Sequence, residues 1–288
     1  MKEIKILPDV FYCLYAIIDR EFSDQHPLSI LNLSFSKVIK EFEIVLDSVL
    51  RCKENKKMDD QILIDYKNLL SSLSAFWKDD TKAILKLFPG VKFKIGDYAT
   101  LSDTIINKIK HDQRQILPRV LYLNDQIIPG FSIAKISQGV VTLCDIVHKK
   151  KNKVGNAISF YYELRRIFLS IYLHGKALNE AIMFSDKSIG ELDHIKDDQC
   201  NKVKNIIDKL NKLPDWYFPS EFDNLLPNID DFEVLNKLYC SNDSQKFYLV
   251  NIKEEQGFVG DGVTRSFSFK KIITEKGLDT YKSRILSN

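Results

Sequence analysis

The sequence lacks the residue patterns that hold together disulfide-rich and metal-dependent proteins. Its five cysteines are odd in number and widely scattered, and none of them forms a C-x-x-C pair. Its five histidines show no H-E-x-x-H motif or other spacing typical of metal ligands. Neither a disulfide framework nor a zinc site is indicated. We expect reduced, mostly buried thiols, and we predict no metal site and no cofactor.

Long hydrophobic runs are also missing. No run of about 18 apolar residues is present, and the first residues, M-K-E-I-K-I-L-P, lack the apolar stretch of a signal peptide. We therefore expect a cytoplasmic protein with no membrane partner. The 42 basic and 39 acidic residues leave a net charge of +3, too small an excess for a protein that coats nucleic acid. Any site for a polyanion must be local.

What the sequence does contain is a series of helical apolar patterns. With 288 residues, 44% hydrophobic and 28% charged, it can fold around a sizeable core. Apolar residues recur every three or four positions over 35–51, 62–76 and 156–184, which predicts amphipathic helices. The short connections among the early helices favour antiparallel neighbours in a bundle.

Alternating apolar residues mark the strands. Three such segments at about 119–147 predict a β-meander, and Val91–Ile95 alternates like a short strand. We therefore predict a mainly α protein of the α+β class, in which residues 1–190 form a helical bundle with the inserted meander. Residues 191–288, which are more polar and contain further strand patterns, are predicted to form a small C-terminal α+β appendage.

The most chemically capable segment runs from Thr100 to Pro118 and is predicted to be one helix. Its polar face carries an amide, an ammonium, an imidazole and a guanidinium at i, i+3, i+4 and i+7: Asn107, Lys110, His111 and Arg114. Histidine can accept the 2′-hydroxyl proton of RNA near neutral pH, lysine and arginine can hold the scissile phosphate, and asparagine can orient the ring. These four residues are the catalytic candidates. The alternative is a solvated helix face or a set of partner contacts.

Further basic residues are candidates for binding RNA. The densest basic run contains Lys149, Lys150, Lys151 and Lys153, whose clustered charge could attract phosphate, although a solvated loop is the alternative. On the long helix over 156–184, Arg166 and His174 lie about 80° apart on the ideal helical period. We predict that both side chains point toward a groove or a partner.

A helical bundle whose long helix carries arginine and histidine resembles the HEPN superfamily over residues 30 to 185. These helical domains often act as metal-independent ribonucleases in toxins and antiphage abortive-infection systems. The family signature is an arginine, four to six residues, and then a histidine on one helix. Here seven residues separate Arg166 from His174, and His111 precedes Arg114. Because HEPN-like sites are usually completed across two domains, the resemblance implies a homodimer or a dedicated protein partner.

Two functions stay open at this point. One is an RNA-binding or metal-independent ribonuclease effector of an antiviral defence or toxin system. The other is a noncatalytic scaffold that binds a protein or a nucleic acid. Catalysis requires a second titratable group close to the candidate histidine, whereas an open face without one favours binding.

Overall fold

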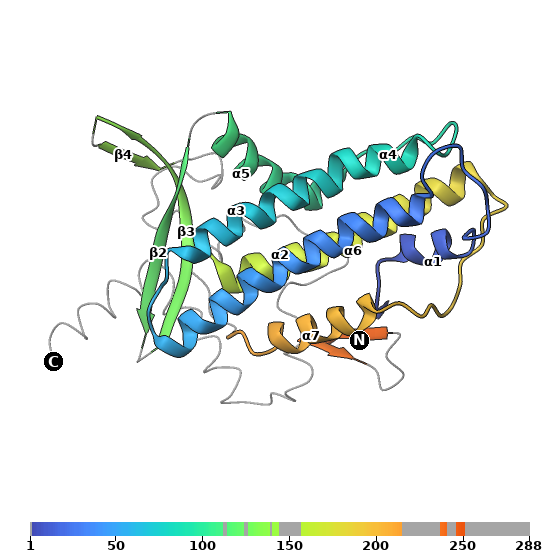
Figure 1. Cartoon of the computed structure of the whole chain (residues 1–288). Coiled ribbons are helices and arrows are strands. Elements are labelled where there is room, and N and C mark those ends of the chain that lie inside the picture. The colour runs from blue at the N-terminus through green and yellow to red at the C-terminus, as the bar shows by residue number, and fades with distance from the viewer. Residues whose placement is uncertain are drawn as a thin grey trace, which may run out of the picture.

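The computed structural model describes residues 2–111, 114–123, 126–138, 140–143, 157–214, 237–240 and 246–250. Long helical rods lie side by side through the molecule (Figure 1). They are α2 (Pro27–Asn55), α6 (Phe160–Ser185), and α3 (Gln61–Ser74), which continues through a π-helical turn, η1 (Ala75–Asp80), into α4 (Thr81–Leu85). None of the described helices is long and apolar enough to cross a membrane.

Shorter helices pack against these rods. They are α1 (Asp9–Tyr15), α5 (Thr100–Lys110), which follows a 3-10 turn, η2 (Asp97–Ala99), and α7 (Gln199–Leu210). Helix α1 packs on α6, α5 on α3, and α7 on α2. Apolar residues from all of these helices belong to one hydrophobic core.

Two antiparallel sheets complete the described fold. The first contains β2 (Gln115–Leu123), β3 (Gln126–Ser137) and β4 (Val140–Leu143) in that order, and β5 (Ile158–Ser159) also pairs with β3. The long strands β2 and β3 stand across one end of the helical rods (Figure 1). The second has the order β1 (Lys2–Lys5), β7 (Lys246–Val250) and β6 (Lys237–Cys240), so the first and the last of the described strands pair with each other.

Helix α2 shows how local sequence sets the boundaries of a rod. His26 caps its start, since the ring Nδ1 accepts a hydrogen bond from the Leu28 N–H at 3.1 Å, and Pro27 occupies the first turn, where no N–H is needed. The helix ends where Lys56 adopts a left-handed conformation with φ 50°. Its inward residues repeat at three and four positions, as the sequence pattern predicts.

Helix α6 is buried on every side along its first half. Every residue from 160 to 172 is buried, including polar and charged side chains. The helix begins at Ser159, whose hydroxyl accepts a hydrogen bond from the Tyr162 N–H at 3.2 Å. A helix enclosed in this way has no solvent face, so its polar side chains must find partners inside the protein.

The predicted fold class is confirmed, because helices make up more than half of the described residues and the sheets are antiparallel. The meander lies between α5 and α6 as predicted, although its first strand already begins at Gln115. The proposed boundary near residue 190 stays a prediction, and the hydrophobic core runs across it because Val203 and Ile207 of α7 join that core.

Two predicted elements are wrong. The helix predicted over 100–118 ends at Lys110, and the Arg114 N–H donates to the Lys108 carbonyl at 3.1 Å as the chain turns into β2. Ile116 continues the helical spacing of Leu101, Ile105 and Ile109 in the sequence, but it lies in β2 and pairs with Ile133 of β3. Residues 91–95 are extended as predicted, but they pair with none of the strands that the structure describes.

The close approach of α6 to the start of α1 gives a test of this packing. A Cβ added at Gly175 would overlap Pro8 Cβ and lie 3.3 Å from Pro8 Cα. We expect Gly175→Ala to lower the free energy of unfolding by about 1–3 kcal/mol, as overpacking does. Urea unfolding measures the change. Gly190→Ala is the matched control, because nothing lies within 4 Å of its added Cβ, and equal stability of the two variants would contradict the packing of α1 on α6.

Candidate functional site

Arg166 is a buried structural residue. Its guanidinium donates from Nε to Glu163 Oε2 and from Nη2 to Glu163 Oε1, both at 2.7 Å, and neither side chain has any exposed surface. It also donates to the Ser102 hydroxyl at 2.6 Å and to the Tyr98 carbonyl at 3.2 Å. Tyr66 donates to Glu163 Oε1 at 2.7 Å. The ion pair therefore connects α6 with α3, α5 and η2 inside the core.

His174 is also fully buried. Its Nε2 lies 2.8 Å from Thr81 Oγ1, and its Nδ1 lies 3.0 Å from the Tyr98 hydroxyl. The Thr81 hydroxyl donates its proton to the Phe76 carbonyl at 2.8 Å, so the hydrogen of the imidazole belongs on Nε2 and Tyr98 donates to Nδ1. Burial lowers the pKa of His174 to about 3, which keeps the ring neutral.

The prediction that Arg166 and His174 point toward a groove or a partner is therefore wrong. Neither side chain reaches a surface, because α6 is enclosed by its neighbours at both positions. Both side chains form their hydrogen bonds within the core. Neither side chain can reach an RNA backbone in this structure.

The catalytic candidates at the end of α5 are only partly brought together. Asn107, Lys110 and His111 are exposed, and His111 is the first residue after the helix. Arg114 lies beyond the turn and is half-buried, so it does not continue the helix face, and its Nε has no hydrogen-bond acceptor among the described residues. Among the residues that the structure describes, no hydrogen bond or ion pair joins the His111 ring to a second titratable group.

The remaining RNA-binding candidates belong to the basic run. Lys149, Lys150, Lys151 and Lys153 all lie outside the described residues. No group of three or more side chains that could hold a metal ion occurs in the part of the chain that the structure describes.

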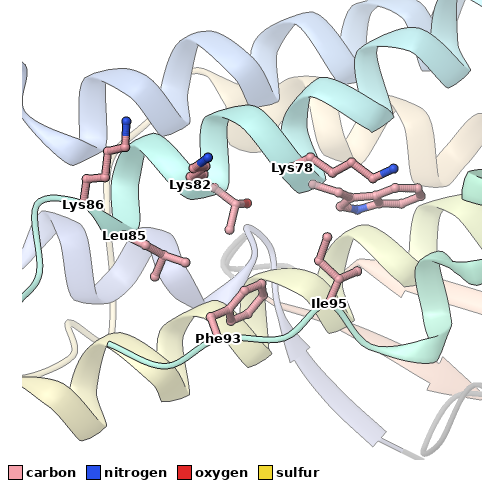
Figure 2. Close-up of a pocket in the computed structure, with 8 residues that line it drawn as sticks. Lys78, Lys82, Leu85, Lys86, Phe93 and Ile95 are labelled. Atoms are coloured by element: carbon pink, nitrogen blue, oxygen red, sulfur yellow. The ribbon is translucent and has the colours of Figure 1, made fainter. Parts of the chain in front are cut away.

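A groove that sequence reasoning missed lies between the helix η1–α4 and the extended segment 91–95. It has a volume of about 450 Å³. Lys78, Lys82 and Lys86, here called the lysine row, follow one another along the helix, and Phe93 and Ile95 face them from the extended segment (Figure 2). The remaining lining residues are Trp77, Thr81 and Leu85.

The alternation of residues 91–95 explains how one wall of this groove forms. Val91, Phe93 and Ile95 are half-buried and pack against the core, whereas Lys92 and Lys94 are exposed. The period-2 pattern that predicts a strand therefore belongs to an extended segment that packs on a helix and not beside another described strand. The result is an apolar lining that lies across the groove from the lysine row (Figure 2).

The lysine row connects to the polar face of α5. Lys78 Nζ lies 3.0 Å from Asp103 Oδ1. Asp103, Asn107 and Lys110 are spaced i, i+4 and i+7, so they share one side of α5. We call these three residues the α5 face. The ion pair places Asp103, at the start of this face, beside Lys78, the first residue of the lysine row.

The π-helical turn at this groove is itself unusual. Such turns are rare and occur frequently at functional sites. Trp77, in the middle of η1, is fully buried, and its indole Nε1 has no hydrogen-bond partner among the described residues. The sequence contained a usable signal for this site, namely lysines at i, i+4 and i+8 followed by V-K-F-K-I.

The buried imidazole gives a pH-dependent prediction. An unfolded histidine titrates near pH 6.5, but folded His174 stays neutral down to about pH 3. The unfolded state therefore binds more protons in this range, and the stability that His174 contributes is lost as the pH falls from about 6.5 toward 3. We expect the free energy of unfolding to fall by about 2 kcal/mol between pH 7 and pH 5 through this residue.

Urea unfolding at the two pH values, with and without His174→Gln, measures this contribution. The variant should lose most of the pH dependence, while His111→Gln, at an exposed site, should keep it. An unchanged pH dependence in His174→Gln would contradict the buried neutral state.

Comparison with protein-family models, with curated proteins and with solved structures yields no match to this chain. The relation to the HEPN superfamily accordingly stays a prediction from sequence. The geometry of the lysine row, its groove and the α5 face is the basis for a functional proposal.

Proposed function

We propose that this protein binds RNA without cleaving it, through the lysine row and the α5 face. One observation carries the proposal: three lysines lie in a row along an apolar groove and adjoin a second polar surface through the Lys78–Asp103 pair. Lysines four residues apart on a helix repeat about every 6 Å. Such a row suits a ligand with regularly repeated negative charges, as a nucleic acid backbone has.

Local charge supports a polyanion as the ligand. Residues 75–95 include the lysine row together with Lys92 and Lys94, against Asp79 and Asp80. Lys82 and Lys86 form no ion pair with any described residue, so their charges are free to meet a ligand. A small net charge over the whole chain is compatible with this local concentration of lysine.

Binding is favoured over cleavage by what surrounds the histidines. His174 is buried and neutral, and Arg166 is engaged with Glu163. His111 lies on an open surface without a described acid or base bonded to its ring. General acid–base catalysis needs a positioned proton acceptor and usually a partner group. The ribonuclease activity, the homodimer and the role in antiviral defence or toxicity remain predictions that follow from the resemblance.

Charge reversal of the lysine row tests RNA binding. We expect Lys78→Glu, Lys82→Glu and Lys86→Glu together to weaken binding of a labelled single-stranded RNA by roughly tenfold or more, because three phosphate contacts are lost. The slope of log affinity against log salt should decrease in magnitude by about 2, since each contact with a single strand contributes about 0.7. Fluorescence anisotropy over a salt series provides both quantities.

The matched control reverses three other lysines that carry the same charge on exposed positions away from the groove: Lys57, Lys202 and Lys212. This control should bind RNA with nearly the wild-type salt slope. Equal losses in both triple variants would mean that net charge alone drives binding, and the proposed surface would be wrong.

Replacing His111 separates binding from catalysis. His111→Ala should leave both RNA affinity and the integrity of the RNA close to wild type, because the residue is exposed and its removal opens no core cavity. Gel analysis of RNA incubated with each protein checks this. Cleavage by the wild type that disappears in His111→Ala would establish the ribonuclease instead.

A further inference from the structure

The floor of the groove is chemically different from its rim. Leu85, Phe93 and Ile95 are half-buried apolar residues below the lysine row. A purely electrostatic surface for a phosphate backbone needs no such floor. An aromatic ring beside a row of cations is the combination by which proteins hold single-stranded nucleic acids, with bases stacked on the ring and phosphates at the cations.

From this arrangement we propose that one base of a single-stranded RNA stacks on Phe93, so that the groove selects single strands over duplexes. The proposal rests on the RNA-binding function and adds the form of RNA that is bound. The flanking phosphates lie at Lys82 and Lys86, which are exposed and form no ion pair with described residues. Bases of a duplex are stacked inside the helix and cannot enter the groove without unpairing.

Both walls of the groove are tied to one buried side chain. Thr81, on the helical wall, lies 2.8 Å from His174 Nε2. Phe93, from the extended segment across the groove, packs edge-on against the His174 ring with 5.6 Å between centroids and 87° between planes. The distance between the walls is therefore set within the core. A groove formed before the ligand arrives loses less entropy on binding than a flexible loop does.

Phe93→Leu is the sharpest test, because it keeps an apolar side chain of similar size against His174 and removes the aromatic face. Binding is measured by anisotropy with an RNA of about 12 nucleotides, a length within the usual range of site sizes, and with the duplex of the same sequence. The wild type should prefer the single strand. Phe93→Leu should lose about 5- to 100-fold in single-strand affinity, the size of one base–aromatic stack, and should bind the duplex as before.

Salt dependence and a control variant separate stacking from other effects. The salt slope of Phe93→Leu should equal that of the wild type, since no phosphate contact is removed. Tyr122→Leu removes an exposed aromatic ring on β2, outside the groove, and should leave both affinities unchanged. Thermal unfolding of Phe93→Leu close to that of the wild type establishes that the loss is local.

Tryptophan fluorescence gives an independent readout. The chain contains two tryptophans, Trp77 in the groove wall and Trp216 outside the described residues. In a Trp216→Phe background, single-stranded RNA should change the Trp77 emission and the duplex should leave it nearly unchanged.

The outcomes distinguish the two proposals. If Phe93→Leu binds the single strand as tightly as wild type while reversal of the lysine row abolishes binding, the stacking site is overturned and the RNA-binding function stands. Equal wild-type affinity for single strand and duplex also overturns the stacking site. If the wild type binds neither RNA, both proposals are wrong.

Discussion

The buried ion pair between Glu163 and Arg166 is the constraint on which the arrangement of the helices depends. An isolated charge in the core would be very unfavourable, so both groups need partners that other elements must supply. Tyr66 of α3 and Ser102 of α5 provide hydroxyls, and the Tyr98 carbonyl provides a further acceptor. These contacts fix α3, α5 and η2 against α6. Removing one partner would leave an unpaired buried charge, which is why the pair determines position even where it adds little net stability.

His174 has the corresponding role two turns further along α6. It joins Thr81 of α4 to the segment that contains Phe93 and Tyr98. Because the ring is neutral and both of its nitrogens are bonded, it acts as a spacer between the walls of the groove. The enclosed His174 of α6 thus helps to shape the groove without reaching its surface, and the proposed contacts with RNA come from lysines on η1 and α4. The core is connected to the groove through the Thr81 hydroxyl and through the contact between the Phe93 and His174 rings.

Sequence reasoning succeeded where hydrophobic periodicity dominates, as in α2, α6 and the meander, and failed where tertiary context decides. Leu101, Ile105 and Ile109 predict α5, but the same period carried on to Ile116, because spacing alone cannot distinguish another helical turn from a strand that pairs with β3. Arg166 falls away from the main apolar stripe of α6 and His174 lies on its edge, so the sequence pattern predicts an outer face for them. Their burial depends on neighbours on all sides of α6, which the pattern of one helix does not show. The Glu163 and Arg166 spacing of i, i+3 was the available hint of an internal ion pair. The lysine row can be recognised in the sequence as a repeat of four residues. The apolar lining of its groove cannot, because it depends on how residues 91–95 pack against the helix.

The central claim is that RNA binds over the lysine row and its groove, and photocrosslinking tests it most directly. A single-stranded RNA containing 4-thiouridine is irradiated with the full-length protein, and the crosslinked peptides are identified by mass spectrometry. We predict crosslinks within residues 75–95, with Phe93 or its immediate neighbours among them, and further crosslinks near Lys110. Crosslinks confined to other parts of the chain, such as 149–153, would contradict the account and move the RNA site away from the groove.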